Sequence, residues 1–276
     1  MSTTNPLASI IKEINESVDE EGSVMMLNDV THKRVDVIPT GIGAIDLAMG
    51  IGGVPRGKIT EIWGDEGTGK TQLCLHLLHQ SNIMGLRAAF VDSEHALSFE
   101  RLEQIGIDPS RIIISQPSFG EQALEIIEMI VRSRKVELVI CDSVAALTPK
   151  SEIDKDMGDA PMGSQARMMS QAMRKLVAII AKGNVAMVFT NQTRAKLGTF
   201  YPEKTTTGGN ALKFYASMRI KLHRIGSVQD KNGSRLAGKY KLTVVKNKLA
   251  VPYREAEYYI GTQGIYVKEQ KDKKEE

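Results

Sequence analysis

The sequence predicts an α/β fold: a mainly parallel, twisted sheet with helices on both faces, antiparallel strands at one edge and a short N-terminal helix. From about residue 35, runs rich in apolar and β-branched residues alternate with helical patterns, which is typical of parallel sheets. Several runs are almost wholly apolar, as expected for strands covered on both faces. After residue 215 the runs follow one another through Gly, Asn and Ser turns, which predicts antiparallel edge strands. The predicted strands are 58–63, 88–92, 112–115, 138–142, 185–192, 218–225, 240–248 and 256–260.

The chain of 276 residues divides into three predicted segments. Asn5 followed by Pro6 predicts a helix start. An apolar stripe then follows at helical spacing: Leu7, Ile10, Ile11, Ile14 and Val18. This helix is expected to pack either on its own domain or on a neighbouring subunit. We predict an N-terminal helix and linker for oligomerisation in residues 1–34, a core in residues 35–267, and a charged, disordered tail in residues 268–276.

Composition limits the possible partners and compartments. The net charge of +3 is too small to indicate a nucleic-acid partner by itself, so a polyanion would need locally clustered Lys and Arg. Cys74 and Cys141 lack the spacing of a metal site and the number of a disulfide framework, which predicts buried, reduced thiols. No export segment is recognisable, and no apolar run is long enough to span a bilayer. We expect a cytoplasmic protein without a membrane partner.

The predicted strand 58–63 leads directly into a glycine-rich loop that continues as a helix, which is the setting of a P-loop. Glycines permit its tight path, and backbone N–H groups with the helix N-terminus face phosphate oxygens. Lys70 is expected to reach the β- and γ-phosphates, and Thr71 to offer its hydroxyl to Mg²⁺. The loop predicts ATP binding with Mg²⁺ through Gly64, Asp65, Glu66, Gly67, Thr68, Gly69, Lys70 and Thr71.

Acidic and amide side chains end the neighbouring strands. Asp142 follows the apolar strand 138–142, where it is expected to hold the Mg²⁺; a helix N-cap is the structural alternative. Asp92 and Glu94 end another strand, and Glu94 is the better candidate to activate water, although spacing alone does not separate the two. Asn191 and Gln192 place amides near the γ-phosphate, so Gln192 could sense it and signal to the loop behind it.

Four longer motifs make the sequence specific. Residues 142–150, 168–176, 205–215 and 244–248 closely resemble those of the bacterial RecA recombinases, and the resemblance covers roughly residues 35–258. It implies a RecA-type P-loop ATPase core that forms helical filaments on single-stranded DNA, with ATP bound between subunits, and that pairs this strand with a homologous duplex.

The resemblance also assigns roles to single residues. It implies that Glu94 is the water-activating carboxylate, that Gln192 senses the nucleotide, and that Lys246 and Lys248 reach the neighbouring subunit's γ-phosphate. Without it, these two lysines would be a solvated strand face. The N-terminal helix and the strand near residues 35–38 are implied to pass to the neighbour.

Two segments resemble the family's DNA-binding loops. The first leads into a predicted helix over residues 164–182. There Arg167, Ser170 and Arg174 share a face suited to a phosphate backbone, while Met162 is implied to wedge between bases. The second, residues 194–209, is long, polar and glycine-containing, which is typical of a functional loop. Its predicted DNA contacts are Arg194, Lys196, Thr207, Gly208, Gly209 and Asn210.

The chain departs from the family pattern in three places. Ser98 and Arg101 stand where the family carries an acidic residue and an aromatic residue against the adenine; a guanidinium can stack on a base, but base selectivity is open. The second loop is about one residue shorter, with aromatic residues near its tip. We expect no counterpart of the family's C-terminal domain after residue 267, and with it an altered duplex capture.

The sequence therefore predicts a DNA-dependent ATPase and strand-exchange recombinase acting on single- and double-stranded DNA in recombination and repair. Two alternatives use the same core. One is an ATP-gated DNA-binding scaffold without efficient strand exchange. The other is a ring-forming helicase motor, for which the segment 205–215 is not typical.

Overall fold

The structure, a computed structural model, describes residues 6–18, 24–29, 35–155, 163–195, 204–230, 233–261 and 264–267. It divides into two compact units between Val35 and Asp36. The first unit holds α1 (Pro6–Ser17) and a short 3-10 helix (Leu27–Asp29). Helix α1 begins at Pro6, as predicted, and none of its residues is buried. Asn5 and the predicted tail, residues 268–276, lie outside the described residues.

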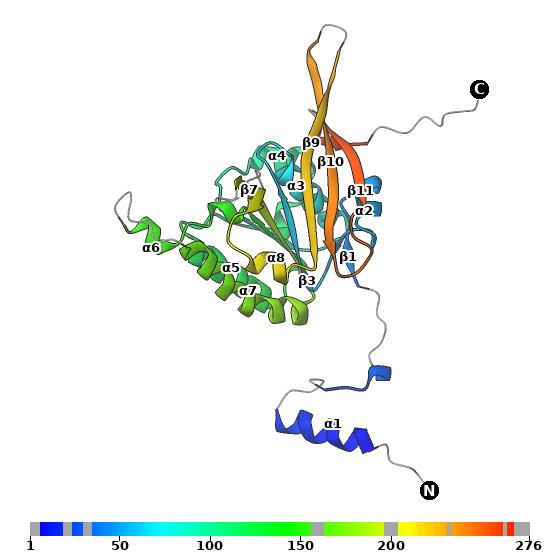
Figure 1. Cartoon of the computed structure of the whole chain (residues 1–276), viewed down its shortest axis with the longest axis vertical. Helices are drawn as coiled ribbons and strands as arrows, with labels where there is room; N and C mark the ends of the chain where they lie inside the picture. Colours follow the sequence, from blue (N-terminus) through cyan, green and yellow to red (C-terminus); the bar gives the residue numbers. More distant parts are fainter. Residues whose placement is uncertain are drawn as a thin grey trace, which may run out of the picture. The chain divides into compact units, whose positions relative to one another are not determined.

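The second unit is built on one large sheet with the order β12-β11-β10-β9-β3-β7-β6-β4-β5, and β8 pairs with β7 (Figure 1). The neighbours from β9 to β5 run parallel, whereas β8, β10, β11 and β12 pair antiparallel, which confirms the predicted mixed sheet. The strands are β3 (Lys58–Gly64), β4 (Ala88–Asp92), β5 (Ile112–Ser115), β6 (Leu138–Asp142), β7 (Ala186–Ala195), β8 (Lys204–Thr206), β9 (Met218–Gln229), β10 (Arg235–Asn247), β11 (Glu255–Gly261) and β12 (Gly264–Tyr266).

Helices cover both faces of this sheet (Figure 1). Side chains of α3 share one apolar cluster with Ile62 of β3, and side chains of α5 and α7 share a second cluster with Ile59 of the same strand. Successive β3 residues thus face opposite layers, as the pleat requires. The helices of this unit are α2 (Gly43–Ala48), α3 (Lys70–Ile83), α4 (Phe99–Gln104), α5 (Gly120–Ser133), α6 (Lys150–Ile153), α7 (Ser164–Gly183) and α8 (Ala211–Tyr215), with 3-10 turns at Pro109–Arg111 and Val144–Ala146.

The sequence prediction misplaced one short strand. Strand β1 (Val37–Ile38) pairs antiparallel with β2 (Val54–Pro55) inside the second unit. Ile38 is fully buried in the cluster that includes α3. Since both its backbone partner and its side-chain contacts come from the same chain, this strand belongs to the core, and the expectation that it passes to a neighbouring subunit is corrected.

Candidate functional site

The loop between β3 and α3 has the backbone that a phosphate cradle needs. Gly69 precedes α3 in the left-handed region, with φ 87°, which glycine adopts without strain. Gly64 is required for space: a Cβ there would lie 2.3 Å from the carbonyl oxygen of Leu222 on β9. Tyr258 of β11 donates its hydroxyl to the carbonyl oxygen of Thr68 at 3.3 Å, which ties the loop to the neighbouring edge of the sheet.

Lys70 is held inside this loop. Its Nζ donates to the carbonyl oxygens of Gly64 at 3.2 Å and Asp65 at 2.9 Å, and the residue is only 8% exposed. Burial lowers the pKa of Lys70 below its ordinary value, while the carboxylates of Asp142 and Glu94 oppose that shift. The ammonium is therefore already placed at the mouth of the loop, on carbonyl partners that phosphate oxygens could replace.

A hydroxyl and a carboxylate meet beside Lys70. Thr71 Oγ1 donates to Asp142 Oδ2 at 2.6 Å, and Thr190 donates to the other carboxylate oxygen. Asp142 is 5% exposed; burial raises its pKa, and the hydrogen bonds from Thr190 and Thr71 oppose the rise. Two hard oxygen donors suit Mg²⁺. Within the described residues no group of three or more His, Cys, Asp or Glu could hold a metal, so Mg²⁺ here would need phosphate and water oxygens as well.

The structure gives Asp92 and Glu94 different surroundings. Asp92 is 2% exposed and accepts from the backbone N–H groups of Ala96 and Leu97 and from Gln116 Nε2, at 3.0–3.2 Å. Its carboxylate thereby fixes the turn after β4, in which His95 has a left-handed φ of 54°. Glu94 is exposed, and its Oε1 accepts from Ser143 and from Gln192 Nε2, the latter at 3.1 Å. Only Glu94 of the two has a carboxylate open to a ligand.

Gln192 lies where the sequence placed it. The ladder pairs Gln192 of β7 with Gly64 at the start of the P-loop, so its amide bridges the P-loop end of the sheet and Glu94. The next residue, Thr193, donates to the Asp65 carboxylate. The P-loop, Asp142, Glu94 and Gln192 thus gather at the carboxyl ends of β3, β4, β6 and β7, which is where open α/β sheets bind ligands.

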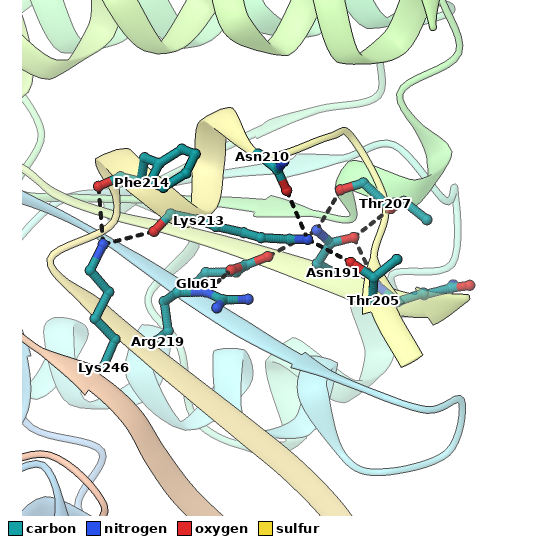
Figure 2. Close-up of polar contacts among 10 residues, drawn as sticks. Glu61, Asn191, Thr205, Thr207, Asn210, Lys213, Phe214, Arg219 and Lys246 are labelled. Carbon is teal, nitrogen blue, oxygen red and sulfur yellow. Dashed lines mark hydrogen bonds and ion pairs between the residues drawn. The ribbon is translucent and has the colours of Figure 1, made fainter. Parts of the chain in front are cut away.

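The structure corrects the predicted position of Asn191. The sequence placed its amide near the γ-phosphate, but the side chain is fully buried. It points to the opposite side of β7 from Gln192, as neighbouring strand residues must. Its Nδ2 donates to Glu61 Oε1 at 3.0 Å and to the Thr207 carbonyl oxygen at 3.1 Å (Figure 2). Glu61 in turn accepts from Arg219. Sequence reasoning missed Glu61 and Arg219, although an acidic residue inside an otherwise apolar central strand was a usable signal.

Lys246 lies level with the middle of β3, and Lys248 lies farther from the P-loop. Lys246 pairs with Arg219, and Arg219 pairs with Glu61, three residues before Gly64. Lys246 Nζ donates to the carbonyl oxygens of Lys213 at 2.7 Å and Phe214 at 3.0 Å, near the end of α8 (Figure 2). Burial, with the charges of Lys248 and Arg219, lowers the pKa of Lys246. Neither lysine is therefore placed to serve the P-loop of its own chain.

The predicted DNA residues divide into three groups. Arg167 and Arg174 of α7 are exposed and Ser170 is half-buried on the same helix. Arg194, Gly208 and Gly209 line a hollow of about 430 Å³ together with the start of α7, and Asn210 is exposed beside it. Thr207 differs, because its hydroxyl is buried and donates to Asn191. Met162, Lys196 and the loop-tip residues 200–202 lie outside the described residues.

At the predicted base pocket, Ser98 is exposed just before α4. The side chain of Arg101 is outside what the structure describes. Among the described helices, none is long and apolar enough to cross a membrane.

The arrangement of these groups defines the class of protein. A strand, a glycine loop and a helix that place a lysine and a hydroxyl–carboxylate pair at the sheet edge make this a P-loop nucleotide-binding protein. Residues 5–266 match the family described as the RecA N-terminal domain. Protein RecA of Thermus aquaticus is 49% identical over 261 residues, covering 94% of this chain and 75% of that protein.

Two further relatives agree. Protein RecA of Oleidesulfovibrio alaskensis is 49% identical over 244 residues, covering 87% of this chain and 68% of that protein. Protein RecA of Francisella philomiragia is 50% identical over 262 residues, with 94% and 72% covered. The chain belongs to the RecA family. This confirms the resemblance drawn from the motifs and supports the predicted role in DNA recombination and repair.

Proposed function

We propose that the protein is a DNA-dependent ATPase that performs ATP-dependent strand exchange as a helical filament on single-stranded DNA. The observation that carries the proposal is the contact between Glu94 and Gln192 beside the P-loop. It joins Glu94, proposed to activate water, to Gln192, which lies just before the second predicted DNA-binding segment, residues 194–209. Family membership supports the same activity.

Within one subunit, the chain's groups would hold ATP and position water. Backbone N–H groups of residues 64–71 and Lys70 would bind the phosphates, and Thr71 with Asp142 would hold Mg²⁺. When bound, Mg²⁺ would neutralise charge on the β- and γ-phosphate oxygens. Glu94 would take the proton of the attacking water. Ser98 and Arg101 would contact the adenine.

The neighbouring subunit would complete the reaction. Lys246 and Lys248 would approach the γ-phosphate bound by the adjacent chain and stabilise charge in the transition state. Their place about 10 Å or more along the sheet from their own P-loop supports this assignment. Hydrolysis would then depend on assembly. A head-to-tail contact of this kind builds an open helical filament when its rotation does not close into a ring.

DNA would bind on the side formed by α7 and the segment after β7. Arg167, Ser170, Arg174 and Arg194 would contact phosphates, and Gly208 and Gly209, which line the same hollow as Arg194, would present backbone groups to them. Met162, Lys196 and Asn210 belong to the same proposed surface, whereas the buried Thr207 would act through Asn191. We assign residues 1–34 to oligomerisation; the exposed apolar stripe of α1, with Leu7 52% and Ile10 50% exposed, supports that assignment.

The test is ATP turnover with Mg²⁺, with and without single-stranded DNA, followed by joint-molecule formation with homologous and non-homologous duplex. We expect turnover to rise with the strand and joint molecules to form with the homologous duplex only. An unchanged turnover rate would contradict the proposal. DNA-stimulated turnover without joint molecules would favour the scaffold alternative, and closed hexamers in electron micrographs would favour the helicase motor.

A further inference from the structure

A buried ion pair lies in the middle of the sheet and belongs to no nucleotide contact. The side chain of Glu61, on β3, is fully buried, and its Oε2 accepts from Arg219 Nε of β9 at 2.5 Å (Figure 2). Its other oxygen accepts from Asn191 at 3.0 Å. Apolar residues of similar volume often stabilise a protein as well as a buried ion pair does. Stability is therefore a weak reason for a carboxylate at this position, and the contacts of its partners indicate another role.

One partner connects the nucleotide end to the DNA-facing segment. Asn191 Oδ1 accepts from the backbone N–H of Gln192 at 2.9 Å and from the Thr207 hydroxyl. Its Nδ2 donates both to Glu61 and to the Thr207 carbonyl oxygen. The amide thus has every donor and acceptor site occupied. It joins the backbone of Gln192, just before the predicted DNA-binding segment 194–209, to Thr207 near the end of that segment.

The other partner connects to the lysine proposed to act on the neighbour. Arg219 lies between Glu61 and Lys246 in the strand ladders. Lys246 Nζ bonds the carbonyl oxygens of Lys213 and Phe214 in α8. Lys213 Nζ in turn donates to Thr205 Oγ1 at 2.5 Å, at the base of the same DNA-facing segment. Figure 2 shows Glu61 with Arg219 and Asn191, and beside them Lys246 at the carbonyl oxygens of Lys213 and Phe214.

We propose that Glu61 is a positioning residue for DNA-stimulated hydrolysis: it fixes Asn191, and with it the ends of the DNA-facing segment, relative to Arg219 and the Lys246 strand. A buried polar network with all partners satisfied is stiff. A displacement of the segment by DNA is therefore passed to Gln192 on one side and to α8 and Lys246 on the other. This inference rests on the proposed function.

The first test is Glu61→Gln. The amide oxygen still accepts from Asn191, but Arg219 loses its counter-charge. We measure the ATP turnover rate with and without single-stranded DNA, the KM for ATP and the thermal midpoint. The expected result is a loss of DNA stimulation of about tenfold, within the usual range of coupling between two sites, while the DNA-independent rate and KM stay within about twofold. Asn191→Asp, which places an oxygen against Glu61, should give the same split.

The matched control is Glu257→Gln, a carboxylate of β11 that pairs with Lys239 at 2.7 Å on the exposed face. It should change none of the four quantities. A double variant, Glu61→Gln with Arg219→Gln, removes both buried charges. Recovery of the thermal midpoint without recovery of DNA stimulation supports the positioning role.

Two results would overturn it. One is full DNA stimulation in Glu61→Gln. The other is a joint fall of stimulated rate, basal rate and thermal midpoint that the double variant restores together, because Glu61 then serves only charge balance. If the wild-type protein itself shows no DNA stimulation, the proposed function fails first, which separates the two failures.

Discussion

The two halves of the proposed reaction site differ in how complete they are within one chain. At the P-loop end, Lys70 is bound to a carbonyl oxygen of the loop, Thr71 contacts Asp142, and Gln192 contacts Glu94. On β10, level with the middle of β3, Lys246 is bound to carbonyl oxygens of α8. The nucleotide half is preorganised within one chain, whereas the proposed charge-stabilising half would be completed only by a neighbouring subunit. The difference teaches that one subunit can be built to bind ATP while its hydrolysis is left to assembly.

The largest effect is expected at the preorganised half. Glu94→Gln should lower DNA-stimulated turnover by about 10²–10⁴-fold, the usual contribution of a general base, with ATP binding retained. Asp92→Asn is the matched comparison, because it weakens the hydrogen bonds that fix the turn after β4. It should lower the thermal midpoint more than the turnover per folded molecule. If Asp92→Asn abolished turnover while Glu94→Gln left it intact, the two roles would be reversed.

The second prediction tests whether the other half acts on the neighbour. Lys246→Ala should lower DNA-stimulated turnover by roughly 10²–10³-fold, as removal of one preorganised donor does. Mixing it with Lys70→Ala protein should restore part of the activity. An intact P-loop then meets an intact lysine at about a quarter of the interfaces if assembly is random. A mixture no more active than its two components would place Lys246 in the site of its own chain.

A smaller effect is expected for α7, the helix proposed to contact DNA, which lies outside both halves. Arg167→Ala and Arg174→Ala should each weaken binding to single-stranded DNA a few-fold and reduce the salt dependence by about one ion. ATP binding without DNA should stay unchanged. Arg132→Ala on α5, where the arginine pairs with Glu128 at 2.7 Å, is the control. Equal losses in all three variants would indicate a general charge effect instead of contact by α7.

The smallest effect tests how firmly the rest of the sheet holds the P-loop. Tyr258→Phe removes the 3.3 Å hydrogen bond to the Thr68 carbonyl oxygen. The expected cost in the free energy of unfolding is about 1 kcal/mol or less, because one neutral hydrogen bond contributes about that much. The KM for ATP should change by less than about twofold. A large rise in KM would show that the contact with β11, and not the loop's own glycines, determines the conformation of the phosphate-binding loop.

Much of the fold could be predicted from local pattern. Strands β4, β5 and β6 match their predicted ranges, since apolar runs between turn residues leave few alternatives. Strands β9 and β10 extend further, to Gln229 and from Arg235, because they continue together as a long hairpin (Figure 1) whose alternation is weak in sequence. The P-loop was predictable because its residues are contiguous.

The sequence by itself determined the fold class, the phosphate loop and the family, since each is written in residues that are neighbours along the chain. Only the tertiary structure decided the roles of groups that meet from distant strands. It turned Asp92 inward and left Glu94 open, buried Asn191 against Glu61, and put Lys246 on the side of the sheet away from its own P-loop. The physical reason is that the pleat, the strand order and burial fix which side chains face each other, and none of these can be counted along the chain.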